Sequence, residues 1–345
     1  MKRNTILGLV GLALIWVPAV FSMGTPQEIQ EYRELQDDPV VPVMLVHGFN
    51  NDASSMTDTE GIVNTYCPGT YTQKAELGCK GYWSLEIQAE KLAKQINNQE
   101  KFKNGCNIIA YSQGTLVARL ALEKGLIKPL VHSLILLAGP HLGVCGAPGT
   151  WDDDIDKTAK KYLKIEPLTA LEKQAYKIFH NNDLLPQLPL SVIEMWHEPT
   201  QEEEYLDHNR VLPYLNGEIK HKDKEAYANN LGKTKIIASF SAENETIVEP
   251  KESTNWEYWD KKRSRILKLE ELKVYDGLKI NELGNHQFQR FPPVPGATHS
   301  NIHKNKALFV STIMPLLAKR SDINPDAGKN NYEETGTSRW SCCCR

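Results

Sequence analysis

One short segment constrains the fold of this chain more than any other, because it places a serine where an apolar run gives way to a helical pattern. The run is Asn107–Tyr111, the helical pattern is Leu116–Glu123, and the junction reads Ala110-Tyr111-Ser112-Gln113-Gly114. A strand that turns sharply into a helix exposes the serine hydroxyl, and it needs small residues two before and two after the serine, where strand and helix pass close together. Ala110, in place of the usual first glycine, and Gly114 meet that need. The segment predicts that Ser112 is a nucleophile at the end of a buried strand.

Other apolar runs place this turn in a larger sheet. Val40–Val46, Ser133–Ala138 and Lys235–Ser241 are short, rich in apolar or β-branched residues and bounded by polar residues, so each is predicted to be a buried strand. Helical patterns alternate with them, at Ile87–Ile96 and again after the serine turn. This alternation predicts the α/β-hydrolase fold, a mostly parallel central sheet with helices on both faces. A last helix is predicted at Ala307–Ala318.

The 345 residues are predicted to form one large domain, 23–320, with a helical insertion at about 144–232 that is rich in Pro, Lys and Glu. Within the insertion, Tyr162–Ile178 has an amphipathic helical pattern. Residues 321–345 are polar and lack periodic apolar positions, which predicts a disordered tail. Its last residues, Cys342-Cys343-Cys344-Arg345, do not fit a prenylation box because the middle positions are not aliphatic, and we assign them no function.

The N-terminus predicts export. Residues 1–22 join a Met-Lys-Arg start to an apolar run, Ile6–Val20, that is shorter than the roughly 20 residues needed to span a membrane. Small residues that suit signal peptidase follow, so we predict a cleaved signal peptide, no stable membrane anchor, and a mature protein in the secretory pathway. Disulfides are permitted there. The candidate pairs are Cys67 with Cys79 and Cys106 with Cys145, although four cysteines allow three connectivities and spacing alone does not choose.

A serine nucleophile needs backbone N–H donors to hold the oxyanion. Gln113, directly after the serine, supplies one in this fold, and the loop after an earlier strand supplies the other. His47-Gly48-Phe49 follows the first strand, so the Phe49 N–H is the predicted second donor, and Gly48 permits a turn that a side chain would obstruct. We interpret His47 as a turn residue that bonds a neighbouring loop and not as the base.

The base follows the acid in this fold, since the order along the chain is Ser, acid, His. His299 lies in a glycine-containing loop just before the last helix, from which an imidazole can reach back to Ser112, and it is the predicted base. His303 is a close rival, but its position predicts an exposed residue in the first turn of that helix. Four further histidines lie in polar surroundings and are predicted to face solvent: His180, His208, His221 and His286.

The acid is expected after the strand Lys235–Ser241, where Glu243, Glu245 and Glu249 are the candidates and spacing does not choose among them. A glutamate can hold the imidazole tautomer and stabilise the imidazolium as an aspartate does. These residues together predict acyl hydrolysis by a Ser–His–acid triad, with no metal and no cofactor required. The net charge of −3, with Lys and Glu interleaved, provides no basic stripe for a nucleic-acid partner.

From about Val43 to Leu317 the chain resembles the palmitoyl-protein thioesterases, lysosomal α/β-hydrolases that remove long acyl chains from cysteine residues. The segments that carry the resemblance are Val46-His47-Gly48, Ser84-Leu85-Glu86-Ile87, Tyr111-Ser112-Gln113-Gly114, Gly139-Pro140-His141-Leu142-Gly143-Val144-Cys145-Gly146-Ala147-Pro148 and Trp196-His197-Glu198-Pro199. The last two are rare outside the family. The family's acid lies in an Asn-Asp-Ser-Ile-Val-Asp-Pro-like segment, so the resemblance selects Glu245, in Asn244–Pro250, as the third member of the triad.

The resemblance also implies a substrate and a location. It implies S-acylated proteins or peptides, or acyl-CoA, as substrates, an apolar acyl-chain groove between Val144 and Gly232, and a destination in the lysosome or outside the cell. Two positions depart from the family pattern: Glu245 is longer than the usual Asp, and Thr115 stands where a second glycine is common. Asn244-Glu245-Thr246 is the chain's only N-glycosylation sequon, so Asn244 is a predicted glycan site.

Two alternatives remain from the sequence. The first is a lipid carboxylesterase or lipase that uses the same triad on oxygen esters. The second is a catalytically silent lipid-binding or chaperone-like lumenal protein, which the presence of every triad residue type in the right order disfavours. Comparing turnover of acyl thioesters and acyl esters separates the first, and the effect of replacing Ser112 separates the second.

Overall fold

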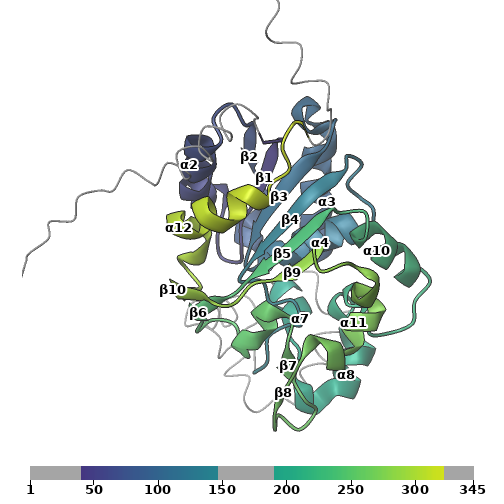
Figure 1. Ribbon diagram of the computed structural model, residues 1–345. Coiled ribbons are helices and arrows are strands. Elements are labelled where there is room, and N and C mark those ends of the chain that lie inside the picture. The colour runs from purple at the N-terminus through teal and green to yellow at the C-terminus, as the bar shows by residue number, and fades with distance from the viewer. Residues whose placement is uncertain (1–39, 147–189, 322–345) are drawn as a thin grey trace, which may run out of the picture.

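Six parallel strands form the centre of the molecule in the computed structural model, which describes residues 40–146 and 190–321 (Figure 1). The four predicted strands are observed as β1 (Val43–Val46), β3 (Cys106–Tyr111), β4 (Val131–Leu137) and β5 (Ile236–Phe240). Two three-residue strands, β2 (Thr72–Lys74) and β9 (Phe288–Arg290), extend the edges, too short for a periodic signal in the sequence. The order is β2-β1-β3-β4-β5-β9 with every pairing parallel, which confirms the α/β-hydrolase fold class.

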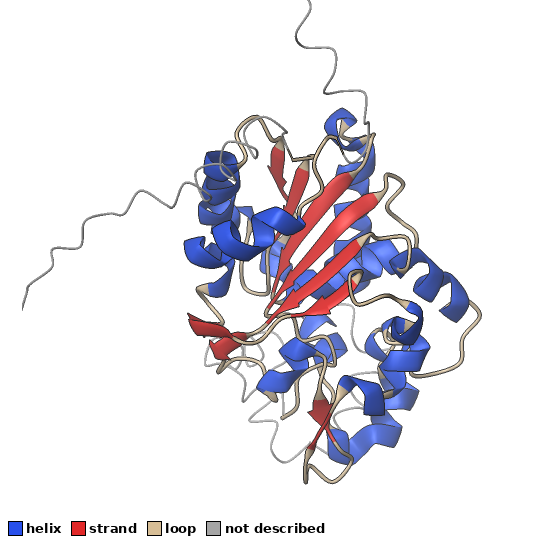
Figure 2. Cartoon of the chain, in the orientation of Figure 1, coloured by secondary structure: helices blue, strands red, loops and turns tan. Residues whose placement is uncertain are grey.

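The strands send alternate side chains to the two faces of the sheet. In β3, Ile108 and Ala110 join one buried cluster, and Ile109 and Tyr111 join the other. The first cluster includes residues of α3 (Leu85–Asn98), α4 (Gln113–Glu123) and α10 (Lys224–Leu231), and the second includes residues of α2 (Thr57–Tyr66) and the C-terminal helical segment. Helices therefore cover both faces, as Figures 1 and 2 show. Burial on both faces explains why these strands are nearly continuous apolar runs.

The C-terminal helix differs from the prediction. Instead of one regular helix over Ala307–Ala318, the chain forms α12 (Lys306–Leu308), a π-helical turn (Phe309–Ile313) and α13 (Met314–Leu316) in succession. Pro315 lies within the last turn and has no N–H to donate to the preceding turn, so the regular hydrogen-bond ladder cannot continue through it. The helical segment ends at Leu316, two residues earlier than predicted.

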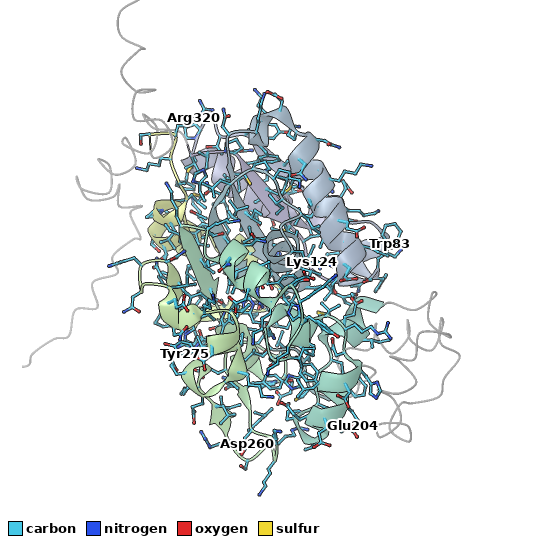
Figure 3. All side chains as sticks on the ribbon, turned by 90° about the vertical axis from the view of Figure 1, so that its right-hand side faces the viewer. Trp83, Lys124, Glu204, Asp260, Tyr275 and Arg320 are labelled. Carbon is cyan, nitrogen blue, oxygen red and sulfur yellow. The ribbon has the colours of Figure 1, made fainter. Side chains whose placement is uncertain are left out.

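Helix α3 begins at Leu85, where Ser84 Oγ accepts a hydrogen bond from the Glu86 N–H and caps the helix. Figure 3 shows the side of the molecule that carries α3, α4 and α10, with Trp83 at the edge just before α3. Lys124, directly after α4, pairs with Glu86 at 2.7 Å and so joins the two helices at the surface.

The described part of the inserted segment, 190–232, is helical. It contains α7 (Leu190–Met195), a 3₁₀ turn at Pro199–Gln201, α8 (Glu202–His208), α9 (Leu212–Leu215) and α10. Glu194 on α7 accepts hydrogen bonds from Ser84 Oγ at 2.7 Å and from the Leu85 N–H at 2.6 Å, so α7 is tied to the start of α3. The predicted helix Tyr162–Ile178 and the rest of the insertion lie outside the described residues.

The segment that begins at Gly139 and the segment Trp196–Pro199, which both carry the family resemblance, lie against each other in the fold. The Val144 N–H donates to the Met195 carbonyl at 2.8 Å, and the His197 N–H donates to the Val144 carbonyl at 2.9 Å. Gly143, with φ +90°, has room for no side chain, because an added Cβ would lie 2.7 Å from His197 Cβ. These contacts anchor the Trp196–Pro199 segment against the turn that follows β4.

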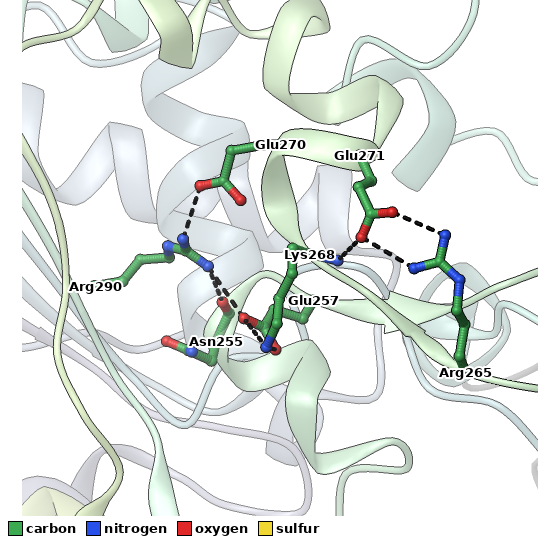
Figure 4. Close-up of polar contacts among 7 residues, drawn as sticks. All are labelled: Asn255, Glu257, Arg265, Lys268, Glu270, Glu271 and Arg290. Atoms are coloured by element: carbon green, nitrogen blue, oxygen red, sulfur yellow. Dashed lines mark hydrogen bonds and ion pairs between the residues drawn. The ribbon is translucent and has the colours of Figure 1, made fainter.

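A charged cluster fastens the segment after β5 to the edge strand β9 (Figure 4). Arg290 of β9 contacts the Asn255 carbonyl at 3.3 Å, Glu257 at 3.5 Å and Glu270 at 3.0 Å, and Lys268 pairs with Glu257 at 3.0 Å. Such partly exposed pairs each contribute about 1 kcal/mol. The other short elements after β5 are β6 (Ala242–Asn244), β7 (Tyr258–Trp259), β8 (Ile266–Leu267), α11 (Lys273–Gly277), β10 (Val294–Thr298), and 3₁₀ turns at Lys251–Asn255, Leu269–Glu271, Ile280–Glu282 and Ile302–Lys304. In the first half, 3₁₀ turns occupy Ala53–Met56, Cys79–Gly81 and Glu100–Phe102.

The predicted disulfides are wrong. Cys67 is buried beside Met314, with 3.4 Å between the sulfurs, whereas Cys79 is exposed, and both are free thiols. Cys106 is also a free thiol; it begins β3, whereas Cys145 follows the end of β4. Because the two strands are parallel, these two cysteines lie at opposite ends of the strands.

The predicted signal peptide, residues 1–22, and residues 322–345 of the predicted tail lie outside the described residues. Among the helices of the described ranges, none is long and apolar enough to cross a membrane.

Candidate active site

Ser112 occupies a sharp turn between β3 and α4. Its φ of +53° and ψ of −129° are strained for a residue with a side chain, as a turn that exposes a nucleophile requires. A Cβ added to Gly114 would lie 2.4 Å from the His47 carbonyl oxygen, so only glycine fits two residues after the serine. Ala110, two residues before it, is fully buried in β3. The small residues are thus explained by close packing.

Thr115, which departs from the family pattern, has a structural explanation. Its hydroxyl donates to the Ser112 carbonyl at 2.7 Å. The same side chain fills the space beside Gly139, where an added Cβ would lie 2.1 Å from Thr115 Oγ1. The extra side chain is therefore accommodated by a glycine on the loop after β4, and it leaves the serine turn intact.

A second small sheet brings the predicted base and acid together. β6 and β10 pair in parallel, with Thr298 opposite Asn244. The residues that follow these two positions are His299 and Glu245, so the register places them side by side. His299 Nδ1 lies 2.8 Å from Glu245 Oε2, and His299 Nε2 lies 2.9 Å from Ser112 Oγ.

The hydrogen-bond partners assign the imidazole tautomer. The Glu245 carboxylate is an acceptor, so His299 Nδ1 carries a hydrogen and donates it, which leaves Nε2 free to accept from the Ser112 hydroxyl. Glu245 Oε1 accepts two further bonds, from the backbone N–H groups of Ile247 at 2.8 Å and Val248 at 3.0 Å. The side chain of Glu245 is fully buried and that of His299 is 9% exposed.

Burial raises the pKa of the Glu245 carboxyl, but its hydrogen bond and charge interaction with His299, together with the Val248 and Ile247 N–H groups, outweigh burial and hold the pKa below its ordinary value. The carboxylate is therefore ionised and able to stabilise a positive charge on His299.

The other candidate carboxylates do not reach the imidazole. Glu243 is exposed and accepts the Gly296 N–H at 2.8 Å, which holds β10 to β6. Glu249 is exposed, and its carbonyl accepts the Cys145 N–H. Of the three glutamates that the sequence left open, the structure brings Glu245 to His299.

The prediction that His303 is exposed is wrong. His303 is 6% exposed, and its ring stacks on Tyr111 with 4.1 Å between the ring centroids. Burial, followed by the nearby charges of Lys304 and His299, lowers its pKa to about 4. His303 is therefore a neutral neighbour of the site at ordinary pH.

Among the described residues, His299 is the histidine that hydrogen-bonds to Ser112, and the others considered above have different surroundings. His47 is buried, with Nδ1 2.9 Å from the Gly48 carbonyl, and burial lowers its pKa. His286 is exposed, and His208 and His221 are half-buried, so only the first faces solvent fully as predicted. His180 lies outside the described residues.

The loop after β1 passes directly beside the serine. A Cβ added to Gly48 would lie 2.8 Å from Ser112 Cβ, so a side chain there would push the serine aside. Phe49 and Asn50 are both held by Tyr82, whose ring packs edge-on against Phe49 at 4.8 Å and whose hydroxyl donates to Asn50 Oδ1 at 2.7 Å.

The segment that carries Tyr82 is itself held by three hydrogen bonds to the carbonyl of Gly81. The Gly81 carbonyl accepts hydrogen bonds from Gln113 Nε2 at 2.8 Å, Gln88 Nε2 at 2.9 Å and Ser191 Oγ at 2.9 Å. Sequence reasoning missed Tyr82 and Gln88. Their only signal was proximity to the Ser84–Ile87 segment of the family resemblance.

Asn244, the predicted glycan site, is exposed beside the buried Glu245. Within residues 40–146 and 190–321, no group of three or more His, Cys, Asp or Glu side chains is arranged to hold a metal ion.

Comparisons with known proteins agree with the sequence resemblance. A family model described as palmitoyl protein thioesterase matches residues 42–299. The lysosomal thioesterase PPT2 of Rattus norvegicus is 26% identical over 283 residues, covering 80% of this chain and 88% of the relative. Palmitoyl-protein thioesterase 3 of Dictyostelium discoideum is 27% identical over 286 residues, covering 80% and 92%. Among solved structures, the Bacillus licheniformis lipase BlEst2 matches with a TM-score of 0.42 and 15% identity, covering 82% and 94%.

Proposed function

The chain belongs to the palmitoyl protein thioesterase family, whose model covers residues 42–299, and from that premise we propose that it hydrolyses thioesters between long fatty acyl chains and cysteine thiols. In this proposal Ser112 is the nucleophile, His299 the general base and Glu245 the acid that orients it. The strongest support is the unbroken hydrogen-bonded chain from Ser112 through His299 to Glu245, at 2.9 and 2.8 Å.

In the acylation half, Ser112 Oγ forms a bond to the acyl carbon while its proton passes to His299 Nε2. The C–S bond then breaks, and His299 returns the proton to the leaving sulfur, which departs as a thiol. Because a thiol has a pKa of about 8.5, the sulfur needs less help from the general acid than an alkoxide would.

In the deacylation half, a water molecule attacks the acyl-Ser112 ester. His299 Nε2 accepts one proton of the water as the O–C bond forms, and returns it to Ser112 Oγ as the ester breaks, which releases the fatty acid. Throughout, the ionised Glu245 holds the hydrogen on Nδ1 and stabilises the imidazolium.

The tetrahedral intermediates carry a negative charge on the former carbonyl oxygen. The Gln113 N–H at the start of α4 and the Phe49 N–H are the proposed donors for this oxyanion, and the positive end of the α4 dipole adds to them. The close approach of Gly48 to Ser112 and the anchoring of Phe49 by Tyr82 support the role of this loop.

The preference for long acyl chains is assigned to the inserted segment between Val144 and Gly232. Each methylene buried in an apolar groove contributes about 0.8 kcal/mol, so such a groove would favour long chains strongly. The substrates proposed are S-acylated proteins or peptides, or acyl-CoA. The PPT2 relatives are named lysosomal thioesterases, which supports a thioester substrate.

The proposed location is the lysosome or, through secretion, the outside of the cell. The same relatives support the lysosome. The proposed N-glycan at Asn244 fits a protein of the secretory pathway, and the exposure of Asn244 supports it.

Turnover of S-palmitoyl N-acetylcysteine and of the matched palmitoyl serine ester, each with the parent protein and with Ser112→Ala, tests the proposal. We expect thioester hydrolysis that the substitution abolishes. Hydrolysis of the oxygen ester alone would indicate a lipase, and thioester turnover that survives Ser112→Ala would contradict the assigned nucleophile.

A further inference from the structure

A polar cavity of about 320 Å³ opens beside the candidate active site, between the start of α2 and the loop after β10. Tyr111 and His303 lie at its base, and both are more than nine-tenths buried. Thr57 and Asp58 of α2 line one wall, and Ser300, which is exposed, lines the other.

Residues of the cavity lining are neighbours of the reacting groups in the chain. Tyr111 immediately precedes Ser112, and Ser300 immediately follows His299. Asn51, also in the lining, donates to the Phe49 carbonyl at 2.9 Å and so touches the oxyanion loop. The Tyr111 ring lies 5.4 Å from the His299 ring, measured between centroids. A group bound in the cavity would therefore lie next to the serine and histidine.

His303 contributes a buried imidazole to the lining of the cavity. Its Nδ1 is buried and has no hydrogen-bond partner within the described residues. The low pKa of His303 keeps the ring neutral, and thus able to act as donor or acceptor.

The position of the general acid identifies which half of a thioester, the acyl chain or the thiol, would lie in the cavity. His299 must return a proton to the leaving sulfur, so the sulfur faces the loop that carries His299, and the chain attached to that sulfur leaves on the same side. Ser300 and His303 belong to that loop. The described part of the insertion lies on the other side, because α7 is bonded to the start of α3 and α9 packs against α4.

We propose that this cavity binds the polar chain attached to the leaving thiol, and that it recognises secondary amides. Amide groups of this kind occur both in the peptide around an acylated cysteine and in the pantetheine arm of acyl-CoA. The Ser54 and Ser55 hydroxyls donate to Asp52, so their oxygens, with Asn51 Oδ1, can accept an amide N–H. The Thr57 hydroxyl accepts from Lys74 and can donate to an amide C=O. The inference rests on the proposed function and specifies the thiol side of its substrate.

Three palmitoyl thioesters that differ only in the thiol test this inference: S-ethyl thiopalmitate, which has no amide, S-palmitoyl N-acetylcysteine N-methylamide, and S-palmitoyl pantetheine. The blocking variant is Thr57→Trp, whose indole would occupy the cavity. The matched control is Thr65→Trp, also exposed and on the same helix but outside the lining.

We expect Thr57→Trp to lower kcat/KM about tenfold for at least one amide-bearing substrate, the loss expected from one or two hydrogen bonds, with little change for S-ethyl thiopalmitate. Whichever substrate responds identifies the source of the amide. The free thiol product should also inhibit the parent more strongly than it inhibits Thr57→Trp. Thr65→Trp should behave like the parent throughout.

Equal effects of Thr57→Trp on all three substrates, or no effect on any, would overturn the assignment of the cavity. Failure of the proposed function gives a different result, since the parent would then show no Ser112-dependent hydrolysis even of S-ethyl thiopalmitate.

Discussion

Two buried carboxylates in this protein are each paired with a basic side chain, yet their pKa values are shifted in opposite directions. Glu245 pairs with His299 at 2.8 Å near the surface loops, and Glu123 pairs with Arg119 at 2.9 Å inside α4. Both glutamate side chains are fully buried. The pKa of Glu245 lies below its ordinary value, whereas burial raises the pKa of Glu123 to about 7 despite the charge and hydrogen bond of Arg119.

The difference lies in the donors. Glu245 receives His299 Nδ1–H and two backbone N–H groups, which use both carboxylate oxygens. Glu123 receives only Arg119 Nε–H, and its Oε2 has no partner within the described residues. A single opposite charge thus does not compensate for burial, but three converging donors do.

The two regions also serve different purposes. Arg119 lies under the ring of Trp256 at 4.5 Å and donates to Asn216 at 3.1 Å, so the Glu123 region links α4, the segment after β5 and the inserted segment. The Glu245 region joins two loops around a histidine that touches Ser112. The first is a structural pair, and the second is placed to support chemistry.

Glu245→Gln should have the largest effect. The glutamine amide can present an N–H to His299 and favour the wrong tautomer, so we expect kcat for a palmitoyl thioester to fall roughly 10³–10⁴-fold while the melting temperature changes little. Glu243→Gln is the control, at the exposed position directly before Asn244. Its amide oxygen can still accept the Gly296 N–H, so this variant should retain parent activity. A Glu245→Gln enzyme within tenfold of the parent would remove Glu245 from the mechanism.

Arg119→Met should destabilise the protein without changing its chemistry. It leaves Glu123 buried without its cation, so we expect a loss of about 3 kcal/mol or more in unfolding free energy at pH 7.5, measured by urea denaturation. Lys124→Met, which breaks an exposed pair with Glu86, should cost less than about 1 kcal/mol. The kcat of folded Arg119→Met should match the parent, and a loss like that of Glu245→Gln would contradict the division of roles.

The pH dependence of stability should have opposite signs at the two sites. Because the pKa of Glu123 is raised from 4.5 to about 7 on folding, its stabilising contribution is complete below pH 4.5 and is lost as pH rises through 7. The contribution of Glu245, whose pKa is lowered, is present above its unfolded pKa and is lost as pH falls through its folded value.

Replacing Glu123 by Gln isolates its contribution. Glu194, whose pKa burial also raises to about 7, gives a slope of the same sign in both proteins, so the difference between parent and Glu123→Gln belongs to Glu123. We expect the parent to lose on the order of 2 kcal/mol more than the variant between pH 4.5 and 8 in urea titrations. Parallel curves would show that folding does not raise the pKa of Glu123.

Glu245→Asp should have the smallest effect. The shorter side chain keeps the charge and can still accept the backbone N–H groups, but it must draw His299 closer to restore the 2.8 Å contact. We expect kcat to fall by about tenfold or less, as when one charge-assisted hydrogen bond is weakened but retained. A loss as large as that of Glu245→Gln would mean that geometry, and not charge, limits this position.

The features predicted correctly from the sequence are those formed by residues that are contiguous in the chain. The turn at Ser112 follows from a strand, a small-residue pattern and a helix that are contiguous, and the four longest strands follow from apolar runs. Residue types and spacing alone could not select Glu245, because its position beside His299 depends on the register of β6 with β10. These strands are only three and five residues long and pair across about fifty residues of sequence.

Of the wrong predictions, the one for His303 shares that cause. His303 was expected to be exposed because it precedes a helix, but its burial depends on the Tyr111 ring at the end of a distant strand. The Cys106–Cys145 pairing was inconsistent with the parallel sheet that the sequence itself predicts. Cys106 begins β3 and Cys145 follows β4, so parallel strands place the two residues at opposite ends.

Trapping the acyl-enzyme tests the central claim most directly. The protein is mixed with a palmitoyl thioester, quenched in acid within the first turnover, digested and analysed by mass spectrometry, with Ser112→Ala in parallel. The account predicts a palmitoyl group on the peptide that contains Ser112 and none in the variant. Rapid thioester turnover with the acyl group on another residue, or with the same labelling in Ser112→Ala, would contradict it.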